Sequence, residues 1–349
     1  MTDEPPSGLP EGTLNLLRVV AVTCVVADHA LGLWGPTVGR VPLIAVGHLG
    51  VAIFFVHSAA VLMASLERMQ RHAPGAMALW AKFMVRRAFR IYPLAIVAIL
   101  GVVALAIPPS AGRLSAPSVF VPPSAASLAA NLALVQNVVP GMLDLISVLW
   151  TLPIEMQLYL LLPFAFLVAR RGWRPAAVML AVTIPLAIAV RMGSSGWAAP
   201  VTALRFAPCF AAGVLAWALC WHAPDRARWS WLQAGAAMTV LVSAYVSLDP
   251  WNPSVVRSWA FCLSLGLLVA RLPELPGGAV ARLAESVAKH SYGVYLFHVP
   301  LLWLAFQHRR SLGVLFDGLL FAGLLVAVCI VSYRFVEKPL IELGRRLSA

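Results

Sequence analysis

The stretch LNLLRVVAVTCVVADHALGLW, residues 14–34, decides how this chain folds. It is apolar over a length sufficient to cross a bilayer as an α-helix, for which about 20 residues are needed. Two ionisable side chains, Arg18 and His29, interrupt this apolar run. Ionisable groups are costly inside a membrane and usually face a protein interior or a watery cavity, so the pair indicates a functional site.

Arg18 and His29 are eleven residues apart. At about 100° per residue, eleven residues rotate the helix by about 20° more than three full turns, so both side chains share one face. Along the helix axis they are about 16 Å apart. Asp28 points about 100° away from His29 and is expected to meet another helix. An imidazole deep in the membrane, with a cation on the same face, suggests chemistry carried out across a membrane.

The composition indicates a polytopic, all-α membrane protein. The chain is 61% hydrophobic and 11% charged, with a mean hydropathy of +0.85, whereas soluble domains are about 25% charged. The N-terminal residues MTDEPPSGLPEGT contain acids and no base, unlike a cleavable signal peptide, so the first helix is expected to remain. The five cysteines lack CxxC spacing, and neither a metal site nor a disulfide framework is expected.

Hydropathy predicts a bundle of about ten transmembrane helices. The predicted spans are residues 14–34, 43–66, 88–107, 147–169, 176–192, 200–221, 231–248, 255–272, 288–307 and 313–335. Of the 26 lysines and arginines, 19 fall on alternate segments of one side. The positive-inside rule makes that side cytoplasmic and places both termini there. The net charge of +12 is therefore mostly topological, and no nucleic-acid partner is expected.

We expect one transmembrane domain over residues 1–349, with cytoplasmic tails at 1–13 and 337–349 and a long external loop at 108–146. The loop contains SLAANLALVQNVV, which is too short to span and is predicted to form an interfacial or re-entrant helix. A loop of this size could cover an acceptor site or be a passive connection. There is no internal repeat of the kind found in many transporters.

Six motifs follow one another from the first predicted span to the last. They are R-x10-H at 18–29, GHLGVAIFFVHSAAVL at 47–62, FMVRRAFRIYP at 83–93, LWTLPIEMQLYLLLP at 149–163, SYGVYLFHVPLL at 291–302 and SYRFVEKP at 332–339. In this order they resemble the acyltransferase-3 family of integral membrane acyltransferases, which modify bacterial surface and secreted sugars. His57 and Ala59 depart from the family pattern, in which an apolar residue and a glycine are usual at these positions.

The resemblance implies an enzyme of the bacterial cytoplasmic (inner) membrane. It would take an acyl group, in the first place acetyl, from cytoplasmic acyl-CoA to a hydroxyl of a glycan, lipopolysaccharide or glycolipid, with no bound cofactor. The residues by themselves are also compatible with two other classes of protein: a transporter or flippase, and a non-catalytic scaffold of a glycan-assembly complex. The variant His29→Ala separates them, because an enzyme would lose turnover and a scaffold would keep its function.

Arg86, Arg87 and Arg90 lie at the predicted cytoplasmic mouth of the third span, where guanidinium forks could hold the phosphates of the donor. Arg87 and Arg90 share a helix face, and the resemblance implies that they form the R-x-x-R motif of the family. The alternative is that the three arginines only anchor the topology.

His29 is the expected catalytic residue. A neutral imidazole could take the proton from a sugar hydroxyl, or could carry the acyl group as a transient acyl-imidazole, and the residues do not separate these routes. Arg18 would extend the cationic path toward it. The alternative is a histidine that only holds helices together by hydrogen bonds.

Further polar side chains fall within the fourth and ninth spans. Glu155, with Tyr159 one turn later, could orient His29, pair with Arg18 or bind acceptor hydroxyls, or else form a structural ion pair. Ser291, Tyr295 and His298 make a polar stripe that is predicted to contact substrate in the same cavity. For His298, a purely structural contact between helices is the alternative.

Overall fold

A computed structural model describes residues 8–109, 119–192, 199–223, 226–248, 255–308 and 312–348, and it is nearly all helical. Apolar segments become helices because only a helix satisfies its own backbone hydrogen bonds in lipid. The helices are α1 (Glu11–Leu31), α2 (Leu43–Gln70), α3 (Ala76–Ala104), α4 (Ala125–Leu132), α5 (Thr151–Ala169), α6 (Trp173–Met192), α7 (Ala207–His222), α8 (Trp231–Ser247), α9 (Val255–Val269), α10 (Ala279–Leu302), α11 (Val314–Ser332) and α12 (Lys338–Leu347).

Shorter elements complete the described chain. They are the two-residue strands β1 (Thr37–Val38) and β2 (Val41–Pro42), the 3₁₀ segment η1 (Ala199–Phe206), and the π-helical turns η2 (Trp303–Gln307) and η3 (Tyr333–Glu337). The two strands pair antiparallel in a small hairpin between α1 and α2. The π-turns matter because such turns accommodate an extra residue and are frequent at functional sites.

Each of the ten predicted spans overlaps a helix, and seven helices in the described part are long and apolar enough to cross a membrane. The helices α8 and α9 are apolar but shorter. α10 is long but is not among the seven, and it carries the charged residues Arg282, Glu285 and Lys289 together with several polar ones. The seven are α1, α2, α3, α5, α6, the helical stretch Ala203–His222, and the stretch Val314–Leu347.

Several boundaries differ from the sequence prediction, and two of these differences concern the arginines and the C-terminal segment. α3 begins at Ala76 and not near residue 88, so Arg86, Arg87 and Arg90 lie well inside a helix and not at its start. Their neighbours in KFMVRRAFR are good helix formers, and a hydropathy window fails at the charges although the helix continues through them. The predicted tail at 337–349 includes the amphipathic helix α12, which packs against α3.

The predicted external loop is partly helical. Residues 110–118 lie outside the described residues, and α4 occupies the middle of the remainder. The fully buried side chain of Asn131 hydrogen-bonds to the backbone of Ser127, Leu143 and Leu145. These bonds connect α4 to the stretch of chain that precedes α5. The side chains of Asn137 and Gln157 bond each other and attach the segment to α5.

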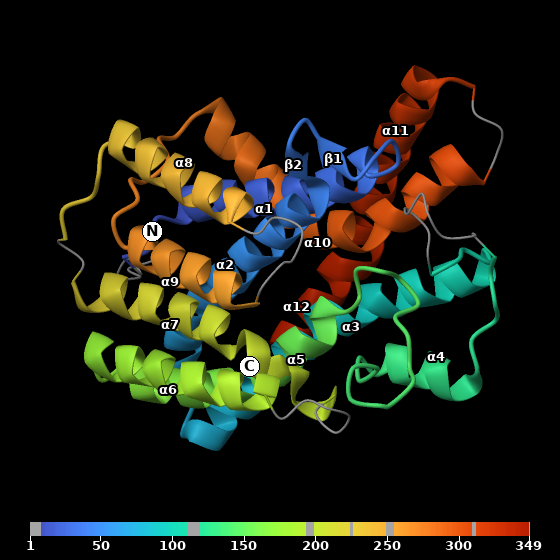
Figure 1. Cartoon of the computed structure of the whole chain (residues 1–349). Coiled ribbons are helices and arrows are strands. Elements are labelled where there is room, and N and C mark those ends of the chain that lie inside the picture. The colour runs from blue at the N-terminus through green and yellow to red at the C-terminus, as the bar shows by residue number, and fades with distance from the viewer. Residues whose placement is uncertain are drawn as a thin grey trace.

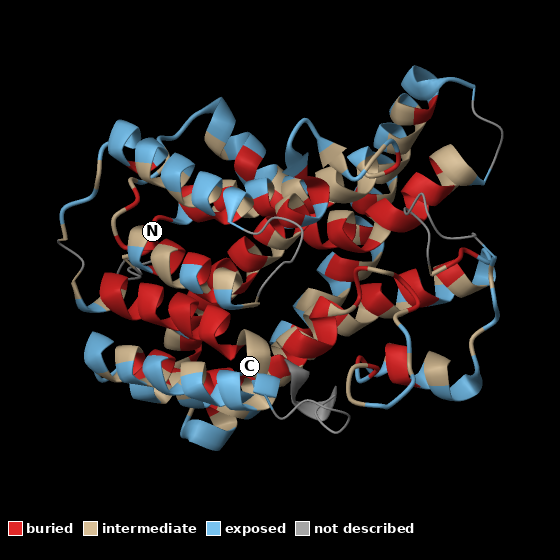
Figure 2. Cartoon of the chain, in the orientation of Figure 1, coloured by how far each residue is buried: buried red, intermediate tan, exposed pale blue. Residues whose placement is uncertain are grey.

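The core lies where α7 meets α2, α6 and α9, and α7 is buried along nearly its whole length (Figures 1 and 2). Small residues permit this close packing. A Cβ at Gly213 of α7 would stand 2.3 Å from the carbonyl oxygen of Val56, and one at Gly266 of α9 would stand 2.5 Å from that of Ala212. α1, α2 and α10 lie side by side in the middle of the molecule, and α3 flanks them.

Candidate active site

A cavity of about 130 Å³ lies between α1, α2, α3, α5 and α10. It is mainly apolar on the α2 side and polar on the other sides. The polar and charged residues that line it are Arg18, His57, Ser58, Arg87, Arg90, Thr151, Glu155, Tyr159, Ser291, Tyr292 and Tyr295. Three guanidinium groups and one carboxylate therefore face a single space, which gives the cavity a net positive charge and suits an anionic ligand.

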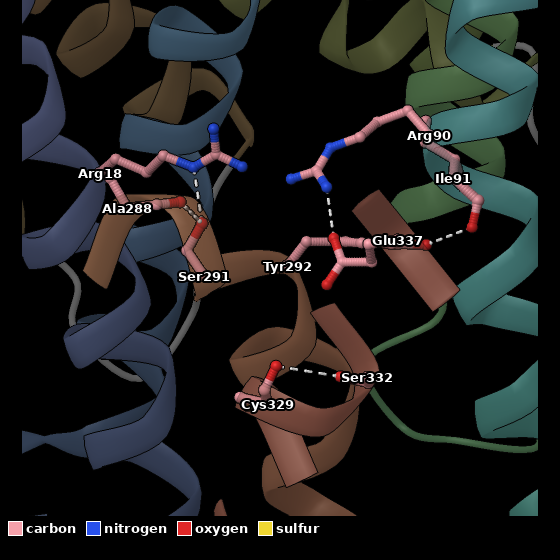
Figure 3. Close-up of polar contacts among 9 residues, drawn as sticks. All are labelled: Arg18, Arg90, Ile91, Ala288, Ser291, Tyr292, Cys329, Ser332 and Glu337. Carbon is pink, nitrogen blue, oxygen red and sulfur yellow. Dashed lines mark hydrogen bonds and ion pairs between the residues drawn. The ribbon is translucent and has the colours of Figure 1, made fainter. Parts of the chain in front are cut away.

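Arg18 enters the cavity from α1 and is held by α10. Its Nε donates a hydrogen bond of 2.7 Å to Oγ of Ser291, whose hydroxyl donates in turn to the carbonyl oxygen of Ala288 at 2.8 Å. Ser291 is 1% exposed, so this anchor is shielded from solvent. The bond holds Nε of the guanidinium, which lines the cavity, and Figure 3 shows the guanidinium on the side of Arg18 that faces Arg90.

Arg90 faces Arg18 from α3. Its Nη1 forms an ion pair with the carboxylate of Glu337 in η3, and its guanidinium lies 5.6 Å from the ring centre of Tyr292. The hydroxyl of Tyr292 donates a 2.7 Å bond to the carbonyl oxygen of Ile91, which joins α10 to α3 next to this pair. Figure 3 shows the guanidinium groups of Arg18 and Arg90 turned toward each other across the gap between α1 and α3.

The two adjacent arginines of α3 have different surroundings. Arg87 lines the cavity, and its Nε is buried without a hydrogen-bond partner in the described part of the chain. Arg86 turns away from the cavity and donates a 2.8 Å bond from Nε to the Ser348 hydroxyl near the end of α12. The structure thus places the two members of the R-x-x-R pair, Arg87 and Arg90, at the cavity, whereas Arg86 bonds Ser348 at the end of α12.

Glu155 and Tyr159 form a pair on α5. The Tyr159 hydroxyl donates to Oε2 of Glu155 at 2.6 Å, and both side chains line the cavity with Arg18. The structure places Glu155 with Tyr159 and the arginines, and the ring of His29 has other partners. Glu155 shares the cavity with Arg18, and pairing with Arg18 stays a prediction, because the hydrogen bond that the described structure gives Glu155 comes from Tyr159.

Tyr295 lines the cavity from α10. Its hydroxyl donates to the carbonyl oxygen of Val148 at 2.8 Å and lies 2.8 Å from Oγ1 of Thr151, at the start of α5. Its ring stands edge-on to Phe54 of α2, with ring centres 6.0 Å apart. These contacts hold Tyr295 across the space between α2, α5 and α10.

His29 and His298 lie beyond Tyr295, outside the cavity lining. Their ring centres are 5.0 Å apart at 75°, and Nε2 of His298 is 3.4 Å from Nδ1 of His29. The ring of His298 lies 6.2 Å from that of Tyr295, between the cavity and His29. The structure therefore divides the predicted polar stripe of α10: Ser291 and Tyr295 line the cavity with Arg18, and His298 contacts His29.

Asp28 lies on a different side of α1 from His29, as its position on the helix predicts. Its carboxylate lies over Gly47 of α2, in the space that a side chain at that position would fill. A Cβ at Gly47 would stand 2.1 Å from Oδ2 of Asp28, so only glycine permits this approach. The aspartate next to the catalytic candidate thus packs against α2.

Five residues of the site were not assigned a role from the sequence: His57, Ser58, Thr151, Tyr292 and Glu337. Tyr292 and Glu337 occur in motifs that were quoted for the family resemblance, but their partners lie more than 200 positions away in sequence. His57, which is 5% exposed, stood out as a departure from the family pattern and lines the cavity from α2. Among the described residues, no group of three or more His, Cys, Asp or Glu side chains has the arrangement of a metal site.

Comparison with known proteins gives two findings. The model of an acyltransferase domain, that of the acyltransferase-3 family, matches residues 11–334. Nodulation protein 10 of Rhizobium leguminosarum bv. viciae is 27% identical over 317 residues, which cover 82% of each chain. No solved structure is significantly similar to the chain. With a match that extends from the start of α1 into η3, the chain belongs to the acyltransferase-3 family and is a membrane acyltransferase.

Proposed function

We propose that this membrane acyltransferase moves an acyl group, in the first place acetyl, from acyl-CoA on the cytoplasmic side to a hydroxyl group of a glycan, lipopolysaccharide or other sugar outside the cytoplasm. The observation that carries the proposal is the order of groups along α1 and α10. A cavity with three arginines lies at one level, and a pair of histidines lies beyond it on the same faces of the same two helices.

The donor proposal rests on the charges of the cavity. The positive charges of Arg18, Arg87 and Arg90 face the same space and repel one another. Phosphate groups bound among them would attract each guanidinium and so offset this repulsion. Acyl-CoA carries phosphates at one end of a long thin arm and the reactive thioester at the other. With the phosphates at the arginines, the arm would pass the Glu155–Tyr159 pair and bring the thioester toward Tyr295 and the histidines.

The hydrogen bonds of His29 support a reactive role for its Nε2. Nδ1 of His29 lies 3.0 Å from the carbonyl oxygen of Val25. A carbonyl oxygen only accepts, so Nδ1 must carry the proton and Nε2 must hold the free lone pair. Both routes expected from the sequence, general base and acyl carrier, use this lone pair.

In the general-base route, the hydroxyl oxygen of the sugar forms a bond to the thioester carbon as its proton moves to Nε2 of His29. The carbon–sulfur bond then breaks, and the proton passes from His29 to the sulfur, so that CoA leaves as the free thiol. Proton transfer by a positioned histidine contributes on the order of 10² to 10⁴ in rate.

The proposed location is the bacterial cytoplasmic (inner) membrane. The predicted orientation, with both termini in the cytoplasm, supports it, because the arginine end of the cavity would then be nearer the donor. The segment between α3 and α5 would lie on the acceptor side, next to Tyr295 through Val148 and Thr151.

The test measures transfer of label from radiolabelled acetyl-CoA in inverted membrane vesicles supplied with a mixed periplasmic glycan extract. Wild type is expected to label a glycan or lipid fraction, and His29→Ala is expected to lose this transfer by on the order of 10²-fold or more. The matched control is His222→Ala, which removes a histidine bonded to Ala169 away from the cavity. Equal labelling by wild type and His29→Ala would refute the role of His29, and no labelling by wild type would refute this donor and acceptor pair.

A further inference from the structure

His298 contacts His29 and lies outside the cavity lining. We propose that it is a positioning residue, which accepts a hydrogen bond from Nδ1–H of His29, fixes the orientation of that ring and shares the charge when His29 takes up a proton. This inference rests on the proposed function of His29 as the reacting histidine.

The tautomers of the two rings follow from their backbone partners. Nδ1 of His298 lies 3.0 Å from the carbonyl oxygen of Val294, and Nδ1 of His29 lies at the same distance from that of Val25. Each Nδ1 therefore carries a proton, because a carbonyl oxygen has none to donate. Nε2 of His298 is left as an acceptor, and it lies 3.4 Å from Nδ1 of His29, the nitrogen that carries the ring proton.

The position of His298 separates this role from substrate binding. Its side chain is 0% exposed, and it lies outside the cavity lining. Its described contacts are the backbone of its own helix, the ring of Tyr295 and the ring of His29. It therefore acts on the reaction through His29.

A histidine suits this buried position better than a carboxylate. Two neutral imidazoles carry no net charge before the reaction, so their burial in an apolar bundle has a low electrostatic cost. When Nε2 of His29 is protonated, the ring becomes positively charged. Two acceptors close to its Nδ1–H, the Val25 carbonyl oxygen and Nε2 of His298, then stabilise this charge. A carboxylate would instead be a buried charge during every part of the cycle in which His29 is neutral.

The first experiment compares His298→Phe with His298→Gln. Phenylalanine fills the space without an acceptor, whereas the side-chain amide of glutamine places an oxygen near the former Nε2. We expect His298→Phe to lower kcat on the order of tenfold to a hundredfold, with KM for acetyl-CoA within about twofold of wild type. We expect the decrease in log kcat of His298→Gln to be at most half of that of His298→Phe. A glutamine variant as slow as the phenylalanine variant, or a loss found mainly in KM, would overturn the proposal.

The second experiment combines the variants. If His298 acts only through His29, then His29→Ala/His298→Phe has the same residual rate as His29→Ala alone. Thermal unfolding of each detergent-purified variant shows whether it is folded, and rates are compared between folded samples. A further drop in the rate of the folded double variant would contradict the proposal. Full activity of His29→Ala would instead refute the proposed function, so the two failures are distinguishable.

Discussion

The cavity and the histidine pair share the helices α1 and α10 but differ in how their polar side chains are held. In the cavity, charged side chains from α1, α3 and α5 surround open space. Arg18 is hydrogen-bonded to Ser291, Arg90 is paired with Glu337, and Nε of Arg87 has no partner in the described chain. At the histidine pair, two rings pack edge to face and every ring Nδ1 has a backbone acceptor. The difference separates binding from reaction: an anionic ligand completes the cavity, whereas the histidines are already oriented without one.

The largest effect that tests this contrast is expected at Glu337. The variant Glu337→Leu leaves the Arg90 side chain, which is 19% exposed, without its partner and beside two other arginines. Removal of one partner of a fully buried pair costs about 3 to 5 kcal/mol of the free energy of unfolding, and the partial exposure of Arg90 places the expected cost at the lower end of this range. We expect a clear fall in thermal stability in detergent, partly restored in Arg90→Leu/Glu337→Leu.

The control for this prediction is Glu342→Leu, because Glu342 is an exposed acidic residue of the neighbouring helix α12. Its stability is expected to stay close to that of wild type. An equal loss of stability in both variants would mean that the fall reflects α12 in general and not the Arg90 pair.

The next effect concerns donor binding by Arg87. The Nε of this side chain is buried without a partner in the described chain, so Arg87 is the arginine most available to a phosphate. We expect Arg87→Gln to raise KM for acetyl-CoA by about tenfold to a hundredfold, the equivalent of about 1.4 to 2.7 kcal/mol, and to change kcat little.

Arg86→Gln is the matched control, since Arg86 is the adjacent residue and bonds Ser348 outside the cavity. Its KM is expected to change by less than about threefold, in line with the small worth of a peripheral polar contact. Similar KM values for the two variants would remove the distinction between the lining arginine and its neighbour.

The smallest effect is expected at Thr151, where the two regions meet. Thr151→Val removes one hydrogen bond from the Tyr295 hydroxyl and leaves its bond to Val148. The net cost is about 0.5 to 1.5 kcal/mol of the free energy of unfolding. Thermal unfolding measures it, and kcat is expected to change by less than about fivefold. A loss of kcat as large as that of His29→Ala would mean that Thr151 takes part in the reaction itself.

Helical periodicity was sufficient to predict which side chains share a face. Arg18 and His29 are eleven residues apart on α1, and Ser291 and His298 are seven residues apart on α10. The two polar faces meet, so that Arg18 contacts Ser291 and His29 contacts His298. Such patterns are local and follow from 100° per residue. The apolar runs likewise predicted the helices, because the lipid leaves few alternatives for the backbone.

Contacts between distant helices could not be predicted in this way. Nothing local distinguishes Arg86, which bonds Ser348, from Arg87, which lines the cavity, since adjacent residues differ only by a rotation that the neighbouring helices define. The pairing of Arg90 with Glu337 joins positions far apart in sequence and depends on a π-turn. The separation of the histidine pair from the cavity depends on Tyr295, whose partners lie on α2 and around the start of α5.

The π-turn η3 has a consequence for how relatives of this chain are aligned. Glu337 reaches Arg90 from the last position of that turn, and a π-turn holds one residue more than an α-helical turn. In a relative with an uninterrupted α-helix here, the equivalent carboxylate would stand one position earlier in the sequence. An alignment without a gap would record it as missing, although it would occupy the same place in space. Deletion of one residue within 333–336 would therefore move the glutamate one position earlier and preserve the ion pair, whereas the same shift of the glutamate without the deletion would rotate it away from Arg90.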